Sequence, residues 1–336
     1  MSLDTQMKKR VRKPMYIAVW ALILTLMIPL STVAAAKDKV DVAIDIKIQL
    51  DGQELKLADP AREKGNKLYL PVAQVAKMFG AQVAWDPDNE EATIDTAFGD
   101  RIVLGNGVPV VYFNDKRYVM ASFPFEMNGR MYVPLRDTAE LLHAKVGWNE
   151  EERIAMLESV PPAVVTEEQG LAEIAKIADV SAGELLKRNG LKSEDDVKAD
   201  AKLRVVIPSI FEHEAAPFTE KDLQLLAKIT QVEAGDESYE SQLAVANVIL
   251  NRVKDSRFPS TIKDVIYSGK QFPPAHNGLL DKSVPKAKAL RAAKDALNGK
   301  NNIEDAVYFY NPKVTKGEFW SSLTVVDTVG SHRYAK

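Results

Sequence analysis

The stretch Thr219–Val253, TEKDLQLLAKITQVEAGDESYESQLAVANVILNRV, decides the fold of the last part of the chain. Thr219, with Asp222 three residues later, has the pattern of a capping box and predicts the start of a helix. Helical spacing of i, i+3, i+4 and i+7 then joins Leu226, Ile229, Thr230 and Glu233. We therefore expect a helix with an apolar face that ends in a carboxylate.

Gly235 interrupts this helix, and a second helix is predicted at about Tyr239–Val253. The second segment is apolar nearly all round, which is typical of a buried helix. Glu233 then lies where a core-facing helix meets a tight turn. Loss of water around a carboxyl group disfavours its charged form and raises its pKa.

A carboxylic acid that is still protonated near neutral pH can protonate a glycosidic oxygen, which is otherwise a poor leaving group. Spacing alone favours a plainer interpretation. In that interpretation Glu233 is a surface or capping residue, and Asp236 and Glu237 are ordinary loop charges.

Composition excludes several classes of protein. The 336 residues are enough for two or three domains. The chain has no cysteine, which rules out disulfides and thiolate metal sites. Because the four histidines are far apart, we expect no metal site and no cofactor; they are His143, His213, His276 and His332. No dense basic stripe is present, so we expect no nucleic-acid partner.

Residues 1–36 are predicted to be a signal peptide. Five basic residues between Lys8 and Lys13 precede the apolar run Met15–Leu30, and Ala34–Ala36 offers a small-residue cleavage site. The run is short for a membrane span, which needs about 20 residues. We expect a secreted protein with no stable membrane anchor after signal cleavage. An uncleaved anchor is the alternative.

Residues 44–159 contain an internal repeat, in which two separate matches have the same offset along the chain. Leu68–Pro71 (LYLP) recurs as Met131–Pro134 (MYVP), and Ala81–Trp85 (AQVAW) recurs as Ala144–Trp148 (AKVGW). Each unit is predicted as strand, turn, strand, helix, strand, strand. We expect the first hairpin turn at Asp51-Gly52, the first helical turns at Pro71 and Pro134, and core positions for Trp85 and Trp148.

These two α/β units resemble the copper amine oxidase N-terminal-like (stalk) domain, which is common in exported proteins of Gram-positive bacteria. The name does not imply a copper site here, because residues 44–159 contain a single histidine, His143, and no cysteine.

Residues 163–209 follow a linker that contains Pro161-Pro162, and they are predicted as a βααβ unit. Ser181 with Glu184 forms a capping-box pattern for the second helix, and Asn189-Gly190 ends it. The unit resembles a LysM domain, which implies binding to glycans. It departs from the family at Glu168–Leu171 and Ala199–Ala201, which flank the family's glycan groove. A spacer that no longer binds sugar is therefore the alternative.

Residues 218–336 carry several ordered motifs: Val232–Glu237, Gln242–Val253, Phe258–Ile262, Gln271-Phe272, Val307–Pro312 and Thr328–His332. Together they resemble the catalytic domain of the spore-cortex-lytic cell-wall hydrolase family. The resemblance implies a mainly helical, lysozyme-like fold with a small β-sheet. It also implies lytic transglycosylation between N-acetylmuramic acid and N-acetylglucosamine, with Glu233 as the catalytic residue. Pro273-Pro274 departs from the family, which tends to have Ser or Thr there.

The remaining candidate residues are predicted to bind substrate: Glu237, Gln271, Phe272, Tyr308, Tyr310, Asn311, Trp320 and His332. Tyr308 and Tyr310 alternate with Phe309 and so share one strand face, on which a sugar can stack. Core packing of Tyr310 is an equal alternative. A hydrogen-bonded structural role for His332 is favoured over a role as general base.

The sequence is therefore interpreted as a multidomain α+β protein that cleaves peptidoglycan glycan strands in the cell wall or spore envelope of a Gram-positive bacterium. Both the spore cortex and the vegetative wall remain open as substrates. If Asp236 or Glu237 instead positions a water, the enzyme is a hydrolytic muramidase. A wall amidase would need a zinc site. A non-catalytic wall-binding or spore-coat protein is the alternative from another class.

Overall fold

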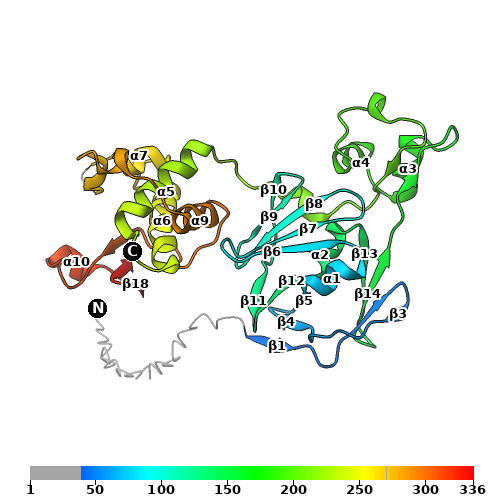
Figure 1. Cartoon of the computed structure of the whole chain (residues 1–336), viewed down its shortest axis with the longest axis horizontal. Coiled ribbons are helices and arrows are strands. Elements are labelled where there is room, and N and C mark those ends of the chain that lie inside the picture. The colour runs from blue at the N-terminus through cyan, green and yellow to red at the C-terminus, as the bar shows by residue number, and fades with distance from the viewer. Residues whose placement is uncertain (1–38, 270) are drawn as a thin grey trace, which may run out of the picture. The chain divides into compact units, whose positions relative to one another are not determined.

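The computed structural model describes residues 39–269 and 271–336 (Figure 1). The predicted signal peptide at residues 1–36 lies outside the described residues. The described chain mixes helices with several β-sheets, in agreement with the α+β class. Among these residues, no helix combines the length and the apolar character that crossing a bilayer requires.

The repeat domain, residues 44–159, is built mainly from strands. Its strands, with β1 directly before it, are β1 (Val40–Val42), β2 (Lys47–Leu50), β3 (Gln53–Glu54), β4 (Arg62–Lys64), β5 (Lys67–Pro71), β6 (Gln82–Asp86), β7 (Glu91–Asp95), β8 (Arg101–Gly105), β9 (Val110–Phe113), β10 (Lys116–Val119), β11 (Phe125–Met127), β12 (Arg130–Pro134), β13 (Ala144–Asn149) and β14 (Ile154–Ser159). Its helices are α1 (Val72–Met78) and α2 (Leu135–Leu141).

The two repeat units meet at the centre of a sheet with the strand order β1-β4-β5-β12-β11. Strands β5 and β12 are antiparallel, and Leu70 lies opposite Val133, its own equivalent in the repeat. A pseudo-twofold axis therefore passes between them. Pro71 and Pro134 close the strands and act as N-caps of α1 and α2, one position before the predicted first turns.

Two hairpins precede each helix, whereas the sequence analysis predicted one. The β2–β3 turn lies at Asp51-Gly52 as expected, but Gly65-Asn66 forms a second turn between β4 and β5. All four residues have positive φ: 50° and 78°, then 55° and 57°. Glycine and asparagine tolerate this conformation, which two-residue hairpin turns require. Asn128-Gly129, the equivalent pair, makes the same turn between β11 and β12.

Trp85 and Trp148 do not lie in the core, so this expectation was wrong. They are 45% and 40% exposed. Their strands are edge strands: β6 ends the sheet β10-β9-β8-β7-β6, and β13 ends the sheet β13-β14-β2-β3. A side chain on an edge strand has no second neighbouring strand to cover it, which leaves both rings accessible.

Residues 163–209 contain β15 (Ala163–Val164), α3 (Leu171–Ala178), α4 (Ala182–Arg188) and β16 (Lys202–Leu203), in that order. The capping box of Ser181 and Glu184 at the start of α4 is present, as predicted. The order of these elements agrees with the predicted βααβ unit, whose closing strand β16 has two residues. A small core joins the helices and strands; its buried members are Val165, Leu171, Ile174, Ala175, Leu185 and Leu203.

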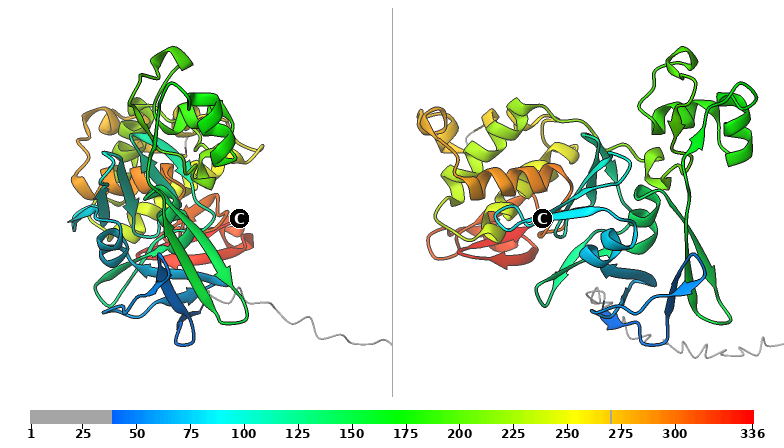
Figure 2. Two further views of the ribbon diagram at one scale, coloured as in Figure 1. Left: turned by 90° about the vertical axis from the view of Figure 1, so that its right-hand side faces the viewer. Right: turned by 45° about the vertical axis from the view of Figure 1, so that its right-hand side comes forward.

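The C-terminal domain, residues 218–336, is mainly helical with one small sheet. Its elements are α5 (Glu220–Ala234), α6 (Tyr239–Lys254), α7 (Ile262–Tyr267), α8 (Leu279–Lys282), α9 (Ala287–Leu297), β17 (Tyr308–Tyr310), α10 (Glu318–Ser322), β18 (Val325–Val329) and β19 (His332–Ala335). Helices α5, α6 and α9 pack against one another (Figure 1). The sheet, in the order β17-β19-β18, contacts α6 and is drawn in red in Figure 2.

The predicted capping box of Thr219 and Asp222 starts α5. Leu226, Ile229 and Thr230 are each 0% exposed, as the helical spacing predicts. Helix α6 begins at Tyr239 and is buried over most of its length, also as predicted. Glu233, the candidate catalytic residue, therefore lies near the C-terminal end of α5, just before α6 begins.

Candidate active site

Glu233 is the second-last residue of α5 and continues the buried face of that helix. Its Oε1 atom is buried and has no hydrogen-bond partner among the described residues. Burial raises the pKa of Glu233, and no compensating charge or hydrogen bond accompanies it. The carboxyl group therefore keeps its proton to a higher pH than an exposed glutamate does, which is the direction predicted from the sequence.

Glu237 lies in the turn between α5 and α6, and polar neighbours surround it. The hydroxyl of Ser331 donates to Glu237 Oε1 at 2.6 Å, and His332 Nδ1 lies 3.4 Å from the same oxygen. Partial burial acts to raise the pKa of Glu237. Hydrogen bonds from Ser331 and Ser241, together with the charge of His332, outweigh burial and lower it. The carboxylate therefore favours the ionised form.

A side chain of α6 holds the turn that separates the two carboxyl groups. Gln242 Nε2 donates to the backbone carbonyls of Gly235 at 3.3 Å and Glu237 at 3.2 Å. A Cβ atom at position 235 would lie 2.3 Å from the backbone oxygen of Gln231, so only glycine fits the turn. The spacing between the two acids is therefore fixed by close packing.

A second glycine, at position 330, leaves the space that the Glu237 side chain occupies. Gly330, at the turn between β18 and β19, has a φ of +58°. A Cβ atom there would lie 2.3 Å from both Glu237 Oε2 and Ser241 Oγ. The hairpin therefore approaches the α5–α6 turn closely because residue 330 has no side chain.

Glu233 and Glu237 are thus two carboxyl groups, four residues apart, whose surroundings shift their pKa values in opposite directions. One group is suited to donate a proton and the other to remain charged. Paired carboxyl groups in unlike surroundings are the arrangement by which glycosidases separate an acid from a charge-stabilising group.

The aromatic candidates gather around β17. Tyr308 and Tyr310 share one face of the strand, as predicted, and Phe309 faces His332 and Tyr334 on the other side. The ring of Tyr308 lies 5.5 Å from that of Phe319, and the ring of Tyr310 lies 5.1 Å from that of Trp320. Tyr310 is only 8% exposed, so packing is its main role in this structure.

Phe272 takes another role, whereas the Asn311 side chain has a hydrogen-bond partner within the chain. Phe272 is 0% exposed, which contradicts a contact with substrate. Its ring packs against Phe309 at 6.3 Å and lies 5.3 Å from the Arg252 guanidinium. The Asn311 side chain accepts a hydrogen bond from the Lys313 backbone at 3.0 Å and so holds the following turn.

Gln271, by contrast, is exposed in the loop before α8 and has no hydrogen bond among the described residues. The sequence analysis named no role for Ser241, Gln242, Gly330 or Ser331, although the quoted motifs contain the last three of them. Ser331 lies directly before His332, a predicted site residue, in the segment Thr328–His332. This position next to a candidate residue could have identified Ser331 from the sequence.

Two known families match different parts of the chain. Residues 236–335 match the model of the cell wall hydrolase family, and residues 49–157 match that of the copper amine oxidase N-terminal domain. The first match begins three residues after Glu233 and includes Glu237. Residues 163–209 lie outside both matches.

Similar curated proteins are named spore cortex-lytic enzymes. The one from Oceanobacillus iheyensis is 36% identical over 120 residues, covering 35% of this chain and 43% of that protein. Those from Bacillus cereus and Bacillus subtilis are each 32% identical over 119 residues; the match covers 35% of this chain and 46% and 39% of those proteins. The chain therefore spans less than half the length of these relatives.

Two solved structures are similar over the same share of the chain. The catalytic domain of the Bacillus cereus SleB protein is 32% identical and has a TM-score of 0.34; the match covers 36% of this chain and 93% of that one. The catalytic domain of the germination-specific lytic transglycosylase SleB from Bacillus anthracis is 31% identical, also with a TM-score of 0.34, and covers 36% and 100%. The chain thus combines a region that matches the copper amine oxidase N-terminal domain with a region that matches the cell wall hydrolase family and is similar to spore cortex-lytic enzymes.

Proposed function

We propose that this protein is a peptidoglycan-degrading enzyme whose C-terminal domain cleaves glycan strands by lytic transglycosylation. The observation that carries the proposal is the buried carboxyl group of Glu233, which has no hydrogen-bond partner at Oε1 among the described residues and a raised pKa. The match of residues 236–335 to the cell wall hydrolase family and the names of the similar proteins support the substrate class.

The reaction begins with proton transfer from Glu233 to the glycosidic oxygen between N-acetylmuramic acid and N-acetylglucosamine. The bond from that oxygen to the muramic C1 carbon breaks, and positive charge develops on the muramic ring. The ionised Glu237, held by Ser331, supplies negative charge that stabilises this cation. Glu233, now a carboxylate, takes the proton of the muramic C6 hydroxyl, whose oxygen closes on C1 to give an anhydro end.

Hydrolysis by water is the second candidate for the same site. A water held by Glu237 or Asp236 would attack C1 and give a reducing end. Glu237 Oε1 already accepts from Ser331 and lies near His332, which leaves this carboxylate less free to activate water. This occupancy disfavours hydrolysis through Glu237 and is the reason that we propose the anhydro product.

The remaining parts are proposed to bring the enzyme to its substrate. Residues 163–209 follow the LysM-like order of elements and would add affinity for the insoluble wall more than turnover, since tethering raises effective concentration. Deleting residues 163–209 should weaken binding to sacculi and leave cleavage of short glycan fragments unchanged. Equal binding with and without them would contradict this role.

Mass spectrometry of the released fragments tests the proposed chemistry. Purified cortex peptidoglycan and purified vegetative sacculi would be digested separately, and loss of turbidity would report solubilisation. We expect anhydro-muramic ends. Reducing ends would establish a muramidase instead. Released peptides with intact glycan would establish an amidase, and binding without release would establish a wall-binding protein.

A further inference from the structure

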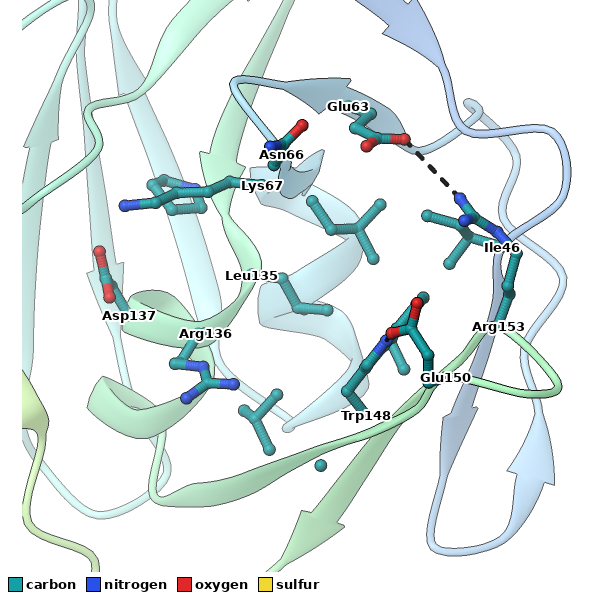
Figure 3. A pocket seen from close by; sticks show the side chains of 15 residues that line it. Ile46, Glu63, Asn66, Lys67, Leu135, Arg136, Asp137, Trp148, Glu150 and Arg153 are labelled. Carbon is teal, nitrogen blue, oxygen red and sulfur yellow. Dashed lines mark hydrogen bonds and ion pairs between the residues drawn. The ribbon is translucent and has the colours of Figure 1, made fainter.

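A cleft of about 620 Å³ lies in the repeat domain, and none of the residues proposed for glycan cleavage line it. Leu135 lies at the middle of its apolar floor (Figure 3). Trp148, 40% exposed, and Glu150 lie on one side, and Lys67 and Asp137 lie on the opposite side (Figure 3). Trp148, which was predicted to lie in the core, is thus part of a concave surface.

Some of the charges in the cleft already have partners. Arg153 lies 3.9 Å from Glu63 and 2.8 Å from Asp45, and the Trp148 indole donates to Glu150. Three other charged residues lie at the cleft, and their side chains have no hydrogen bond or ion pair to a residue that the structure describes: Lys67, Arg136 and Asp137. Burial, followed by the neighbouring Glu140, raises the pKa of Asp137, and the nearby charges of Lys67 and Arg136 act against this rise. These three groups are available to a ligand.

The internal repeat supplies a comparison for this arrangement. The offset that relates Leu68 to Met131 also relates Lys67 to Arg130 and Gln74 to Asp137. In the other half of the domain, the equivalent pair is joined by a carboxylate of the chain itself. Asp59 Oδ2 accepts from Arg130 Nε at 3.2 Å and from Gln74 Nε2 at 3.2 Å.

Asp59 belongs to residues 55–61, the segment between β3 and β4. The Ala58 backbone N–H donates to Gln74 Oε1 at 2.8 Å, so both the backbone and the carboxylate of the segment are bound. Leu55 and Leu57 pack against the hydrophobic core of the domain. The pair Arg130 and Gln74 therefore holds a short segment of the chain that bends at Ala58-Asp59 and presents one carboxylate.

The equivalent segment of the second unit, residues 118–124, makes its backbone hydrogen bonds to other parts of the chain. The Val119 backbone N–H donates to the His213 carbonyl, and that of Met120 donates to the Pro109 carbonyl, both at 2.8 Å. No hydrogen bond or ion pair joins residues 118–124 to Lys67 or Asp137, all of which the structure describes. The chain thus fills one of the two related positions with its own peptide and leaves the other open.

We propose that the cleft binds a short, aspartate-containing segment of another protein, similar to residues 56–60 of this chain. Lys67 takes the place of Arg130 and, with Arg136, binds the ligand carboxylate. Asp137 takes the place of Gln74 and accepts a backbone N–H. An apolar ligand side chain lies on the floor against Trp148. This inference concerns residues 44–159 and does not depend on the proposed glycan cleavage.

Isothermal titration calorimetry with the full chain tests the proposal. The probe is the acetylated and amidated peptide Lys-Leu-Ala-Asp-Pro, which copies residues 56–60. We expect measurable binding that weakens about tenfold or more in Lys67→Met and in Asp137→Ala, as for the loss of a charge-assisted hydrogen bond. A probe with Asn in place of Asp should weaken to the same degree.

Two further variants separate the site from general effects. Lys145→Met removes an exposed lysine of β13 that does not line the cleft, and it should bind the probe as the parent does. The double variant Lys67→Arg with Asp137→Gln restores the residue pair that holds Asp59, and it should bind at least as tightly. Thermal melts would show that each variant is folded.

The source of the natural peptide is distinguished by competition. Stem peptides released from peptidoglycan should fail to displace the probe, because the proposed occupant is a protein segment similar to residues 56–60. Displacement by stem peptides at a lower concentration than by the unlabelled probe would contradict this source. No probe binding by the parent chain would overturn the proposal. So would equal binding by Lys67→Met, or tighter binding of a chito-oligosaccharide than of the probe.

Discussion

Ser331 Oγ lies 2.6 Å from Glu237 Oε1 and donates a hydrogen bond that joins the turn before α6 to the β18–β19 hairpin. Ninety-four positions separate the two residues in the chain. This bond, with the neighbouring His332, is what distinguishes Glu237 from Glu233. Glu237 has hydrogen-bond donors around it, whereas Glu233 Oε1 is buried and has no hydrogen-bond partner among the described residues.

Gly330→Ala should displace this hairpin from Glu237. The new Cβ would meet Glu237 Oε2 and Ser241 Oγ at 2.3 Å, and an L-residue at positive φ adds about 1–2 kcal/mol of strain. We expect lower activity and a lower melting temperature. Gly278→Ala is the matched control, because φ there is +80° with nothing within 4 Å. Equal losses in both variants would show that backbone strain alone is responsible.

The pH dependence of cleavage should report both carboxyl groups. Activity requires Glu237 ionised and Glu233 protonated, so it should fall on the acid side as Glu237 gains a proton and on the alkaline side as Glu233 loses one. Ser331→Ala removes a donor to Glu237 and should move the acid limb to higher pH, leaving the alkaline limb in place.

Ser268→Ala is the control for that profile, since its hydroxyl bonds to the Val265 carbonyl and not to either acid. Rates would be measured on soluble glycan fragments across the pH range. An unmoved acid limb in Ser331→Ala would contradict the role given to this hydrogen bond.

Glu233→Gln should change the pH dependence of stability in a defined direction. The pKa of Glu233 is higher in the folded than in the unfolded chain, so its contribution is complete below the unfolded pKa and is lost as pH rises through the folded one. Relative to the parent, the variant should therefore gain stability as pH rises above about 4.3. Urea unfolding at several pH values measures this difference. Exposed Glu240→Gln is the control, and a relative loss of stability with rising pH would contradict the prediction.

Arg252→Met should destabilise the C-terminal domain. Arg252 is 4% exposed, its Nε donates to the Val307 carbonyl at 2.7 Å, and its guanidinium lies 5.2 Å from the ring of Phe258. Leaving that buried carbonyl unpaired costs about 1–3 kcal/mol. Exposed Arg257→Met should cost much less. Thermal unfolding compares the two, and equal melting temperatures would contradict this account of the core.

Local sequence patterns predicted the parts of the fold that depend on neighbours along the chain. Thr219 with Asp222 fixed the start of α5, and the spacing of Leu226, Ile229 and Thr230 fixed its buried face. The raised pKa of Glu233 followed from its place on that face. The lowered pKa of Glu237, by contrast, depends on hydrogen bonds from Ser331 and Ser241, which no local pattern predicted.

The missed features depend on contacts between distant segments. Ser331 reaches Glu237 from the far end of the domain, so no periodicity could place it. Phe272 was predicted to bind substrate because it belongs to a quoted motif, but tertiary packing buries it completely. The turn at Gly65-Asn66 had a local signal, a Gly-Asn pair directly before the strand sequence KLYLP, and was overlooked. The exposure of Trp148 follows from sheet order, which the repeat pattern does not specify.

The rate of glycan cleavage by Glu233→Gln, compared with that by Glu237→Gln, tests the central claim most directly. Glutamine keeps the size and polarity of the side chain and cannot donate the proton. General acid catalysis contributes about 10²–10⁴-fold, so Glu233→Gln should lose at least that factor while its circular dichroism stays unchanged. Glu237→Gln should lose less. A larger loss in Glu237→Gln, or near-normal cleavage by Glu233→Gln, would contradict the assignment of Glu233 as the catalytic acid.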